Sequence, residues 1–391
     1  MATWMTRNRP SVDSWKSDDM IARDPIVAAL LRPAGTLGLD GAGWDLLIRQ
    51  GRRANLLARL AHEIDAAGLI SEIPIAPRQH LKSALLMVER QHVAMRWEVE
   101  CIRRALVELD APVILLKGAA YVMAGLPAAK GRTFSDVDIL VPRARLEATE
   151  SKLMIHGWQG GHHTDYDERY YRRWMHEIPP MRHVRRGTTI DVHHTILPDT
   201  ARIRVNTPAL IDAAEPLTGH PGLFVLKPTD MLLHSATHLF HEGELGNGLR
   251  DLFDLDSLFR HFGAHEGFWD ALVPRAVELG LSRPLYYAVR YTMRLLNTPI
   301  PEKVVEAAQA GSPPRTVGAV MDACYERAFR PHHASCRDGG TDAALLALYI
   351  RSHWMRMPFP LLAAHLTRKA LARPKLPELE PGLGKDAEPT G

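Results

Sequence analysis

The spacing of apolar residues predicts helices towards both ends of the chain. Over 21–108, hydrophobic side chains recur every three or four positions, as they do on one face of an α-helix. The same period returns after Pro228 and predicts a second helical region over 226–372. The longest helical stretch, over 80–109, carries one apolar stripe whose spacing is typical of helix packing: Leu85, Leu86, Val93, Trp97, Ile102 and Leu106.

Between the two helical regions the pattern changes to that of strands. Residues 112–116 form a short, unbroken apolar run, which is typical of a buried strand. A Lys-Gly turn and a short predicted helix follow. Residues 135–141 then alternate between polar and apolar, which puts Asp136 and Asp138 on one side of a predicted strand and aliphatic residues on the other.

A hairpin is predicted farther along the chain. Residues 182–186 and 188–193 have the pattern of paired strands around Gly187, and the second strand carries Asp191 between two β-branched residues. The whole pattern is typical of an α+β fold. We expect a mixed β-sheet with flanking helices, over 109–225, embedded between the N-terminal and C-terminal helical regions.

The two ends of the chain contain too few apolar residues to join a core. Residues 1–20 are polar and mixed in charge, and we expect a flexible arm there. Residues 373–391 repeat Pro, Gly, Glu and Lys, a composition typical of a disordered tail.

Composition narrows the class of protein. A net charge of +3 over 391 residues leaves no dense basic stripe, so no dedicated nucleic-acid binding is expected. The three cysteines form no CxxC pair, which argues against a zinc ribbon or a disulfide framework. No apolar run approaches the roughly 20 residues that span a bilayer, and the N-terminus lacks the apolar core of a signal peptide. We therefore expect a cytoplasmic protein with no membrane partner.

Three aspartates in this pattern point to a metal site. Asp136 and Asp138 project from the same side of a strand, about 6–7 Å apart along it, and Asp191 lies on another predicted strand. Magnesium favours one or two carboxylates together with substrate phosphates, and a third carboxylate completes a two-metal clamp. Three carboxylates that converged without a cation would repel one another. The alternative is structural, because aspartates at strand ends often bind backbone amides or cap helices.

The order of these segments resembles a known superfamily. An apolar strand, a glycine turn, a helix, an aspartate-x-aspartate strand and a later acidic strand follow the pattern of the minimal, polymerase-beta-like nucleotidyltransferases. Residues 114–118, 132–141 and 190–193 resemble more narrowly the bacterial family of uncharacterised nucleotidyltransferases. The resemblance extends over roughly residues 25–300.

The resemblance implies a magnesium-dependent enzyme that moves a nucleoside monophosphate from an NTP to an acceptor and releases pyrophosphate. Asp136 and Asp138 would bind two Mg²⁺ ions, and Asp191 would join one ion and help to deprotonate the acceptor. Gly118 would let the backbone approach the nucleotide phosphates, because it has no Cβ. The chain departs from the superfamily at Ala119, where a serine or a second glycine is usual. This departure leaves catalytic competence open.

Three further residues are candidates for nucleotide binding. Lys117 and Arg132 stand beside the predicted turn and loop, where they would meet phosphates as a point charge and as a bidentate fork. The alternative for both is plain solvation. Ser135 would cap or brace the loop before the aspartates, and no Ser-His-Asp arrangement supports a role as a nucleophile.

Several histidines and one acidic helix leave alternatives open. His234 and His238 stand four apart on a predicted helix, a spacing that zinc uses, but helix packing accounts for them without a third ligand. His193 faces the same side of its strand as the nearby aspartate, so it would contact a nucleotide or hold that carboxylate. Arg250 and Asp251 would form salt bridges where their helix meets the sheet, or contact substrate.

Two other functions fit the same pattern. One is an AMP transferase of the antitoxin type, whose acceptor would be a protein side chain and not a small molecule. A catalytically weak nucleotide-binding or scaffold module would keep the fold without turnover. The identity of the NTP, the acceptor and the oligomeric state do not follow from the sequence.

Overall fold

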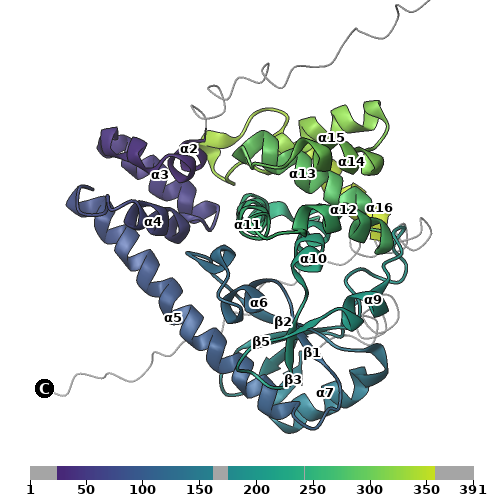
Figure 1. Ribbon diagram of the computed structural model, residues 1–391. Coiled ribbons are helices and arrows are strands. Elements are labelled where there is room, and N and C mark those ends of the chain that lie inside the picture. Colours follow the sequence, from purple (N-terminus) through teal and green to yellow (C-terminus); the bar gives the residue numbers. More distant parts are fainter. Residues whose placement is uncertain (1–23, 162–174, 242, 357–391) are drawn as a thin grey trace, which may run out of the picture.

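A computed structural model describes residues 24–161, 175–241 and 243–356 (Figure 1). The flexible arm expected over 1–20 and the disordered tail expected over 373–391 both lie outside these residues. Along the described chain, the strands of the sheet lie in the middle of the sequence, with one helical region before them and another after them. The α+β fold expected from the sequence is therefore confirmed.

The N-terminal helices pack around apolar faces of the kind predicted. In α3, Trp44 and Leu47 are buried, and the Asp40 side chain accepts a hydrogen bond from the Gly43 amide at the start of the helix. The longest helix, α5, extends away from the other N-terminal helices towards the sheet (Figure 1). The helices of this region are α2 (Pro25–Leu31), η2 (Pro33–Gly38), α3 (Gly41–Arg53), α4 (Leu57–Ala66) and α5 (Ile75–Ala105).

One detail of the predicted packing in α5 is wrong. The side chains of Val93 and Trp97 are 62% and 56% exposed, and Leu86 is exposed too. Ile102 and Leu106 of the predicted stripe are buried, and the other large apolar residues that α5 buries are Leu81, Val88, Met95 and Val99. Each exposed residue precedes a buried one by two positions, or about 200° around the helix. The two apolar stripes lie on opposite sides, and only one packs inward.

The sheet has seven strands in the order β3-β4-β5-β2-β1-β7-β6. Strand β1 pairs antiparallel with β2 and parallel with β7, whereas β2 pairs parallel with β5. The predicted hairpin is confirmed as β4 and β5, which are antiparallel. The strands are β1 (Val113–Leu115), β2 (Asp136–Leu140), β3 (Trp158–Gly160), β4 (Met181–His183), β5 (Thr189–His193), β6 (Glu215–Pro216) and β7 (Leu223–Val225).

Helices within the sheet region lead into and out of the central strands. Helix α6 starts two residues after β1, and η3 follows it on the way to β2. The elements are α6 (Lys117–Met123), η3 (Pro127–Ala129), η4 (Arg143–Arg145), α7 (Leu146–Ile155) and α9 (Thr207–Asp212).

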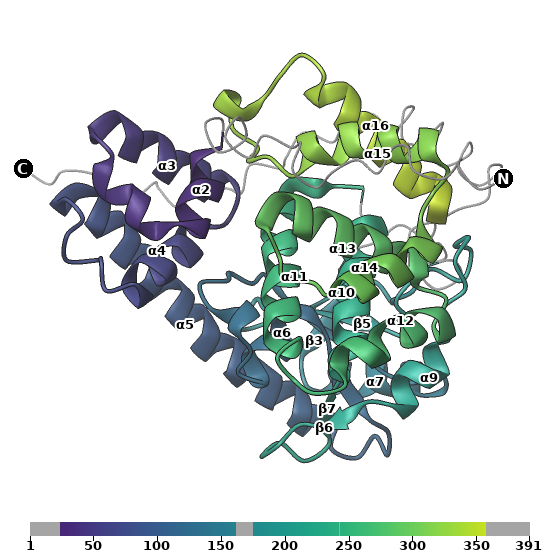
Figure 2. The ribbon, with the colours of Figure 1, turned by 45° about the horizontal axis from the view of Figure 1, so that its top comes forward.

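The C-terminal helices cover the part of the sheet region that holds α6. Helix α10 contacts α6, and α11 contacts η3; Figures 1 and 2 show α10 and α11 between the sheet and the later helices. Phe240 on α10 stacks in a cluster of aromatic rings with Tyr291 and Tyr325. The region comprises α10 (Pro228–His241), η5 (Leu245–Asn247), α11 (Gly248–Phe262), α12 (Phe268–Glu278), α13 (Ser282–Leu296), α14 (Glu302–Ala308), η6 (Gln309–Gly311), α15 (Arg315–Ala328), η7 (Ala334–Cys336) and α16 (Thr341–Arg356).

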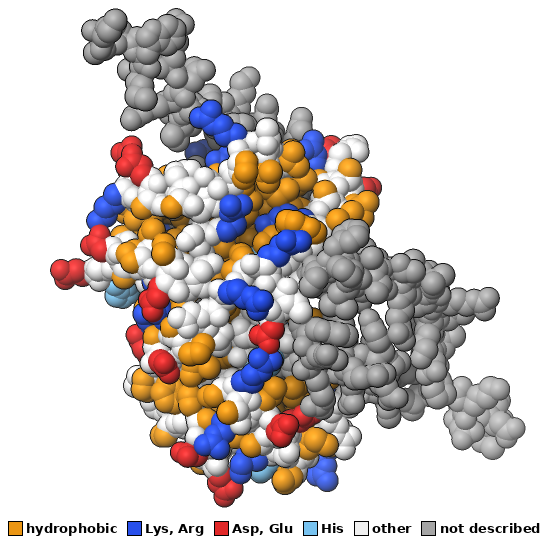
Figure 3. Space-filling model, turned by 90° about the vertical axis from the view of Figure 1, so that its right-hand side faces the viewer, with side chains coloured by type: hydrophobic (Ala, Val, Ile, Leu, Met, Phe, Trp, Pro, Cys, Tyr) orange, Lys and Arg blue, Asp and Glu red, His pale blue; other side chains and the backbone are white. Residues whose placement is uncertain are grey.

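A single apolar core joins all three regions. It runs from Ile26 in the first described helix, through Ile114 and Ile190 in the sheet, to Leu348 in the last. On the face in Figure 3, Lys and Arg side chains are scattered between apolar patches. Among the described helices, none has the length and apolar character needed to cross a membrane.

Candidate active site

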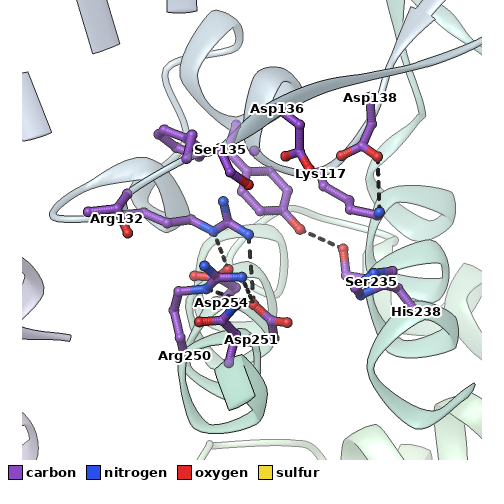
Figure 4. Close-up of a pocket in the computed structure, with 15 residues that line it drawn as sticks. Lys117, Arg132, Ser135, Asp136, Asp138, Ser235, His238, Arg250, Asp251 and Asp254 are labelled. Atoms are coloured by element: carbon purple, nitrogen blue, oxygen red, sulfur yellow. Dashed lines mark hydrogen bonds and ion pairs between the residues drawn. The ribbon is translucent and has the colours of Figure 1, made fainter. Parts of the chain in front are cut away.

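A pocket of about 190 Å³ opens between the start of β2 and the helices α10 and α11 (Figure 4). Its walls come from four places: the β1–α6 junction, the loop before β2, α10, and the η5–α11 segment. The lining residues include four of the predicted nucleotide-binding residues and two of the three predicted metal-binding aspartates. They are Lys117, Gly118, Tyr121, Arg132, Thr133, Phe134, Ser135, Asp136, Asp138, Ser235, His238, Asn247, Arg250, Asp251 and Asp254.

The register of the sheet brings the three aspartates together. Strands β2 and β5 are parallel, and Asp138 lies directly opposite Asp191. Asp136 is two residues earlier on β2, so its side chain projects from the same face as that of Asp138. Figure 4 shows the carboxylates of Asp136 and Asp138 side by side at the upper edge of the pocket. Asp191 is on the adjacent strand but does not line the pocket.

Asp138 is held by two basic groups. Lys117 Nζ lies 3.1 Å from Asp138 Oδ1, and His193 Nε2 lies 3.0 Å from the same oxygen. Burial alone would raise the pKa of Asp138, but the Lys117 charge and the His193 hydrogen bond outweigh burial and hold this pKa well below its usual range. The carboxylate is therefore ionised, and its other oxygen takes part in neither contact.

Asp191 is in the opposite electrostatic situation. Its Oδ1 is buried and has no hydrogen-bond partner. Burial, followed by the charges of Asp138 and Glu177, raises the pKa of Asp191 to about 7. Burial and the charge of Asp138 also raise the pKa of Asp136. Two of the three carboxylates thus lack sufficient positive charge from the protein.

Lys117 reaches Asp138 from an unusual backbone conformation. Its φ is +42°, a left-handed value that costs energy for a residue with a side chain. This conformation falls at the first residue of α6, where the chain leaves β1 and turns into the helix. The sequence predicts a phosphate as the partner of this side chain; in the structure its partner is the Asp138 carboxylate.

Gly118 is required by packing around the pocket. A Cβ at this position would come within 2.3 Å of the Phe134 ring and 2.7 Å of the Arg132 guanidinium. The neighbours that require a glycine here are side chains. The approach of nucleotide phosphates to this backbone, expected from the sequence, stays a prediction. Ala119 is buried and does not line the pocket, so a hydroxyl at that position would face the core.

Arg132 belongs to a buried ionic network. Its Nε donates to Asp254 Oδ2 at 2.6 Å, and its guanidinium lies 4.9 Å from the centre of the Phe134 ring. Asp254 also accepts a hydrogen bond from Arg59 on α4, at 2.6 Å. The network ties the N-terminal helices and the loop before β2 to α11. The preceding Gly131 has φ +66°, and a Cβ there would lie 2.3 Å from the Arg59 backbone.

The expected salt bridging by α11 is present. Arg250 donates to Asp251 Oδ1 from Nε at 2.9 Å and from Nη2 at 2.8 Å. Both residues also line the pocket, opposite the aspartates of β2 (Figure 4). Burial raises the pKa of Asp251 despite the two arginines beside it. Ser135 is the last residue of the loop before β2, and its side chain hydrogen-bonds Asp136. This contact fits the expected role of Ser135 in bracing the loop.

Helix α10 supplies polar side chains to the same cavity. Ser235 and the Tyr121 hydroxyl are 2.6 Å apart, and His238 lines the pocket. Burial, and then the Lys117 charge, hold the pKa of His238 well below its usual value, so the ring is neutral. His234 is buried and likewise neutral, because burial lowers its pKa to about 3. Among the described residues, the pair belongs to no group of metal-ligating side chains.

Two residues beside the aspartates were missed by reasoning from the sequence. A single β-bridge between Glu177 and His193 brings His176 and Glu177 next to β5. The His193 imidazole thus lies between Asp138 and Glu177. No repeat or strand pattern surrounds Glu177 in the sequence, and only the bridge to β5 brings it to the site.

The charges that line the pocket favour a substrate that arrives with cations. Four carboxylates and three basic side chains face the cavity: Asp136, Asp138, Asp251, Asp254, Lys117, Arg132 and Arg250. Three of the four carboxylates already hold a lysine or arginine of this set as an ion pair. A polyphosphate entering beside Asp136 would therefore meet like charge unless a divalent cation accompanied it.

The sequence was compared with protein families, curated proteins and solved structures, and one family matches. Searches of curated proteins and of solved structures found no match to the chain. The family described as uncharacterised nucleotidyltransferase matches residues 40–297, about two thirds of the chain. That range contains β1, β2 and β5 together with α10 and α11, and so every residue that lines the pocket. The chain therefore belongs to the uncharacterised nucleotidyltransferase family.

Proposed function

We propose that the protein is a magnesium-dependent enzyme of the minimal nucleotidyltransferase type. It transfers a nucleoside monophosphate from an NTP to an acceptor hydroxyl or phosphate and releases pyrophosphate. The observation that carries this proposal is the convergence of Asp136, Asp138 and Asp191 from two adjacent parallel strands beside a pocket.

The carboxylates fit a hard divalent cation. Asp191 Oδ1 is a buried acceptor without a donor, and the raised pKa values of Asp136 and Asp191 reflect unbalanced negative charge. Oxygen ligands of this kind suit Mg²⁺, which keeps its remaining positions for water and phosphate. When bound, Mg²⁺ stabilises the charge that develops on the attacking and leaving oxygens.

The chain's own groups position the donor. Lys117 lines the pocket beside Asp138, and phosphate oxygens compete with this carboxylate for its ammonium. Arg132 and Arg250 carry the positive charge at the opposite wall, so the polyphosphate lies across the pocket between the two walls. His238, Ser235 and the Phe134 ring are available to the ribose and base.

The transfer is an in-line displacement at the α-phosphorus. The acceptor oxygen forms the new P–O bond as the bond to the bridging oxygen of pyrophosphate breaks, and pyrophosphate carries away the electron pair. The proton of the acceptor passes to a nearby base, for which Asp191, opposite Asp138 on the adjacent strand, is the candidate. The protein contributes mainly orientation and electrostatics.

The test is release of pyrophosphate by the full chain with Mg²⁺ and each NTP. We expect Asp136→Asn and Asp138→Asn each to reduce release by at least about 100-fold, the scale of losing one electrostatic contact to the transition state. Asp270→Asn is the matched control, because Asp270 is an exposed carboxylate on α12. Circular dichroism checks the fold of each variant. Normal turnover in both β2 variants would refute the proposal.

The same assay separates the alternatives. Labelled NTP incubated with the protein alone, with bacterial proteins and with small-molecule pools reports which class of acceptor becomes labelled. Calorimetric binding of NTP and Mg²⁺ without pyrophosphate release in any arm would instead support a nucleotide-binding scaffold. The departure at Ala119 does not decide between these alternatives, because a hydroxyl at that buried position would face the core.

A further inference from the structure

The segment before β4 and strand β5 bring two imidazoles and a carboxylate together. One ligand atom from each of His176, Glu177 and His193 lies within 4.8 Å of the other two. Glu177 Oε2 is 3.3 Å from His193 Nδ1 and 3.9 Å from His176 Nε2. The two imidazole rings lie 5.2 Å apart at an angle of 31°. The proposed nucleotidyl transfer uses neither His176 nor Glu177.

The Nδ1 atom of each imidazole in this group lacks a hydrogen-bond partner. His193 is 3% exposed, and its Nδ1 is buried without a hydrogen bond although Glu177 Oε2 is close by. His176 Nδ1 is also buried and without a partner. A buried polar group left unsatisfied destabilises the folded protein. The approach of these atoms without hydrogen-bond geometry is what a set of metal ligands shows before the ion enters.

We propose that His176, Glu177 and His193 bind a divalent transition-metal ion, with Zn²⁺ as the ion of choice. Two imidazoles and one carboxylate are a known zinc ligand set, and they leave a fourth position for water or substrate. Imidazole nitrogens favour zinc and its neighbours, whereas carboxylates and water favour magnesium. The protein thus carries two cation sites of different chemistry, and this site does not depend on the proposed transfer reaction.

The second nitrogen of His193 connects the two sites. When Nδ1 ligates the ion, Nε2 keeps its hydrogen and donates it to Asp138 Oδ1, 3.0 Å away. Metal-bound histidines usually donate their other N–H to a carboxylate in this way. The ion fixes the tautomer and the ring orientation of His193. His193 in turn holds the Asp138 carboxylate in place through its hydrogen bond.

The experiment is a Zn²⁺ titration of the full chain by calorimetry, after chelator treatment and in excess Mg²⁺, without nucleotide. We expect one equivalent of Zn²⁺ to bind. Glu177→Gln and His176→Ala should each weaken binding by about 100-fold, at the upper end of the effect of losing even an outer partner of a metal ligand. Asp136→Asn and His156→Ala should leave it unchanged, since Asp136 belongs to the other site and His156 is exposed on the surface.

A second measurement does not depend on affinity. Co²⁺ added in place of Zn²⁺ should give visible absorption bands of low coordination number in the unmodified chain, and these bands should vanish in Glu177→Gln. Circular dichroism and the metal-free melting temperature verify that the variants fold. Absence of Zn²⁺ binding by the unmodified chain would overturn the proposal and leave His193 as a protonated bridge between Asp138 and Glu177. Loss of Zn²⁺ in Asp136→Asn, with retention in Glu177→Gln, would overturn it too.

Discussion

At the scale of single residues, Asp191 responds most directly to the pH. Its pKa of about 7 in the folded protein exceeds the value of about 4 in an unfolded chain. The folded protein therefore binds a proton that the unfolded chain releases over this range. The corresponding stability is present below about pH 4 and is lost as the pH rises through about 7.

A divalent cation competes with that proton. We expect the apparent affinity for Mg²⁺ to fall about tenfold between about pH 8 and pH 6, because one carboxylate of pKa about 7 must lose its proton before it ligates. Calorimetric titration at both pH values measures this change. Asp191→Asn should bind Mg²⁺ weakly and with little dependence on pH. Equal affinity at both pH values in the unmodified chain would show that Asp191 does not hold the ion.

Gly118 allows a second prediction at this scale. Gly118→Ala puts a methyl group 2.3 Å from the Phe134 ring, so the loop before β2 must shift. We expect a loss of about 1–3 kcal/mol in the free energy of unfolding, the usual cost of overpacking, together with reduced pyrophosphate release. Urea denaturation measures the first quantity. Gly41→Ala is the control, since a Cβ at Gly41 meets nothing within 4 Å; equal stability of the two variants would contradict the prediction.

At the scale of helices and strands, the predictable elements are those with an uninterrupted local pattern. The apolar run of β1, the alternation in β2 and the hairpin of β4 and β5 are legible in the sequence. The sequence pattern does not predict the strands β3, β6 and β7, which have two or three residues each. Strands β1 and β4 are also three residues long, but the apolar run over 112–116 and the turn at Gly187 mark them in the sequence. Pairing with neighbouring strands defines β3, β6 and β7, and the sequence does not record that pairing.

The candidate site also contains residues that the sequence predicts and residues that only the structure reveals. The convergence of Asp136, Asp138 and Asp191 follows from side-chain alternation and from strand order. The partner of Arg132 does not, because Asp254 lies more than a hundred residues later, on α11. Glu177 also depends on a long-range contact, the bridge to β5. Local patterns therefore identify the ligands, whereas the groups that hold or neutralise them require the three-dimensional structure.

The network around Asp254 predicts a large effect on stability. Asp254 accepts from Arg59 and Arg132, and its side chain is 3% exposed. Asp254→Asn removes the carboxylate paired with Arg59 and the nearer of the two carboxylates beside Arg132. We expect a loss of about 3–5 kcal/mol in the free energy of unfolding. The comparison is Asp270→Asn, which breaks the exposed pair with Lys303 and should change stability by less than about 1 kcal/mol. Similar losses in chemical denaturation would refute the structural role of the network.

At the scale of the molecule, the sheet depends on the helices that follow it. The apolar core is continuous from Ile26 to Leu348. The Tyr121–Ser235 hydrogen bond and the Arg132–Asp254 ion pair also cross from the sheet region to α10 and α11. The pocket has walls from both regions, so neither region alone forms a site.

A truncated chain tests this dependence. We expect residues 1–226 alone to show no cooperative unfolding transition and to bind a hydrophobic dye, because the apolar surface under α10 and α11 is exposed. The full chain should unfold in one transition, since its core is shared. Thermal circular dichroism and dye fluorescence measure both properties. Cooperative unfolding of the shorter chain would show that the sheet region folds independently.

The contact of Gly131 with α4 gives the N-terminal helices a part in the chemistry. The loop that carries Arg132 lies directly against the Arg59 backbone, with no room for even a methyl group between them. A displacement of α4 by a fraction of an ångström therefore moves one wall of the pocket. Substitutions in α4 that shift this helix should therefore change the turnover rate, although they lie outside the pocket.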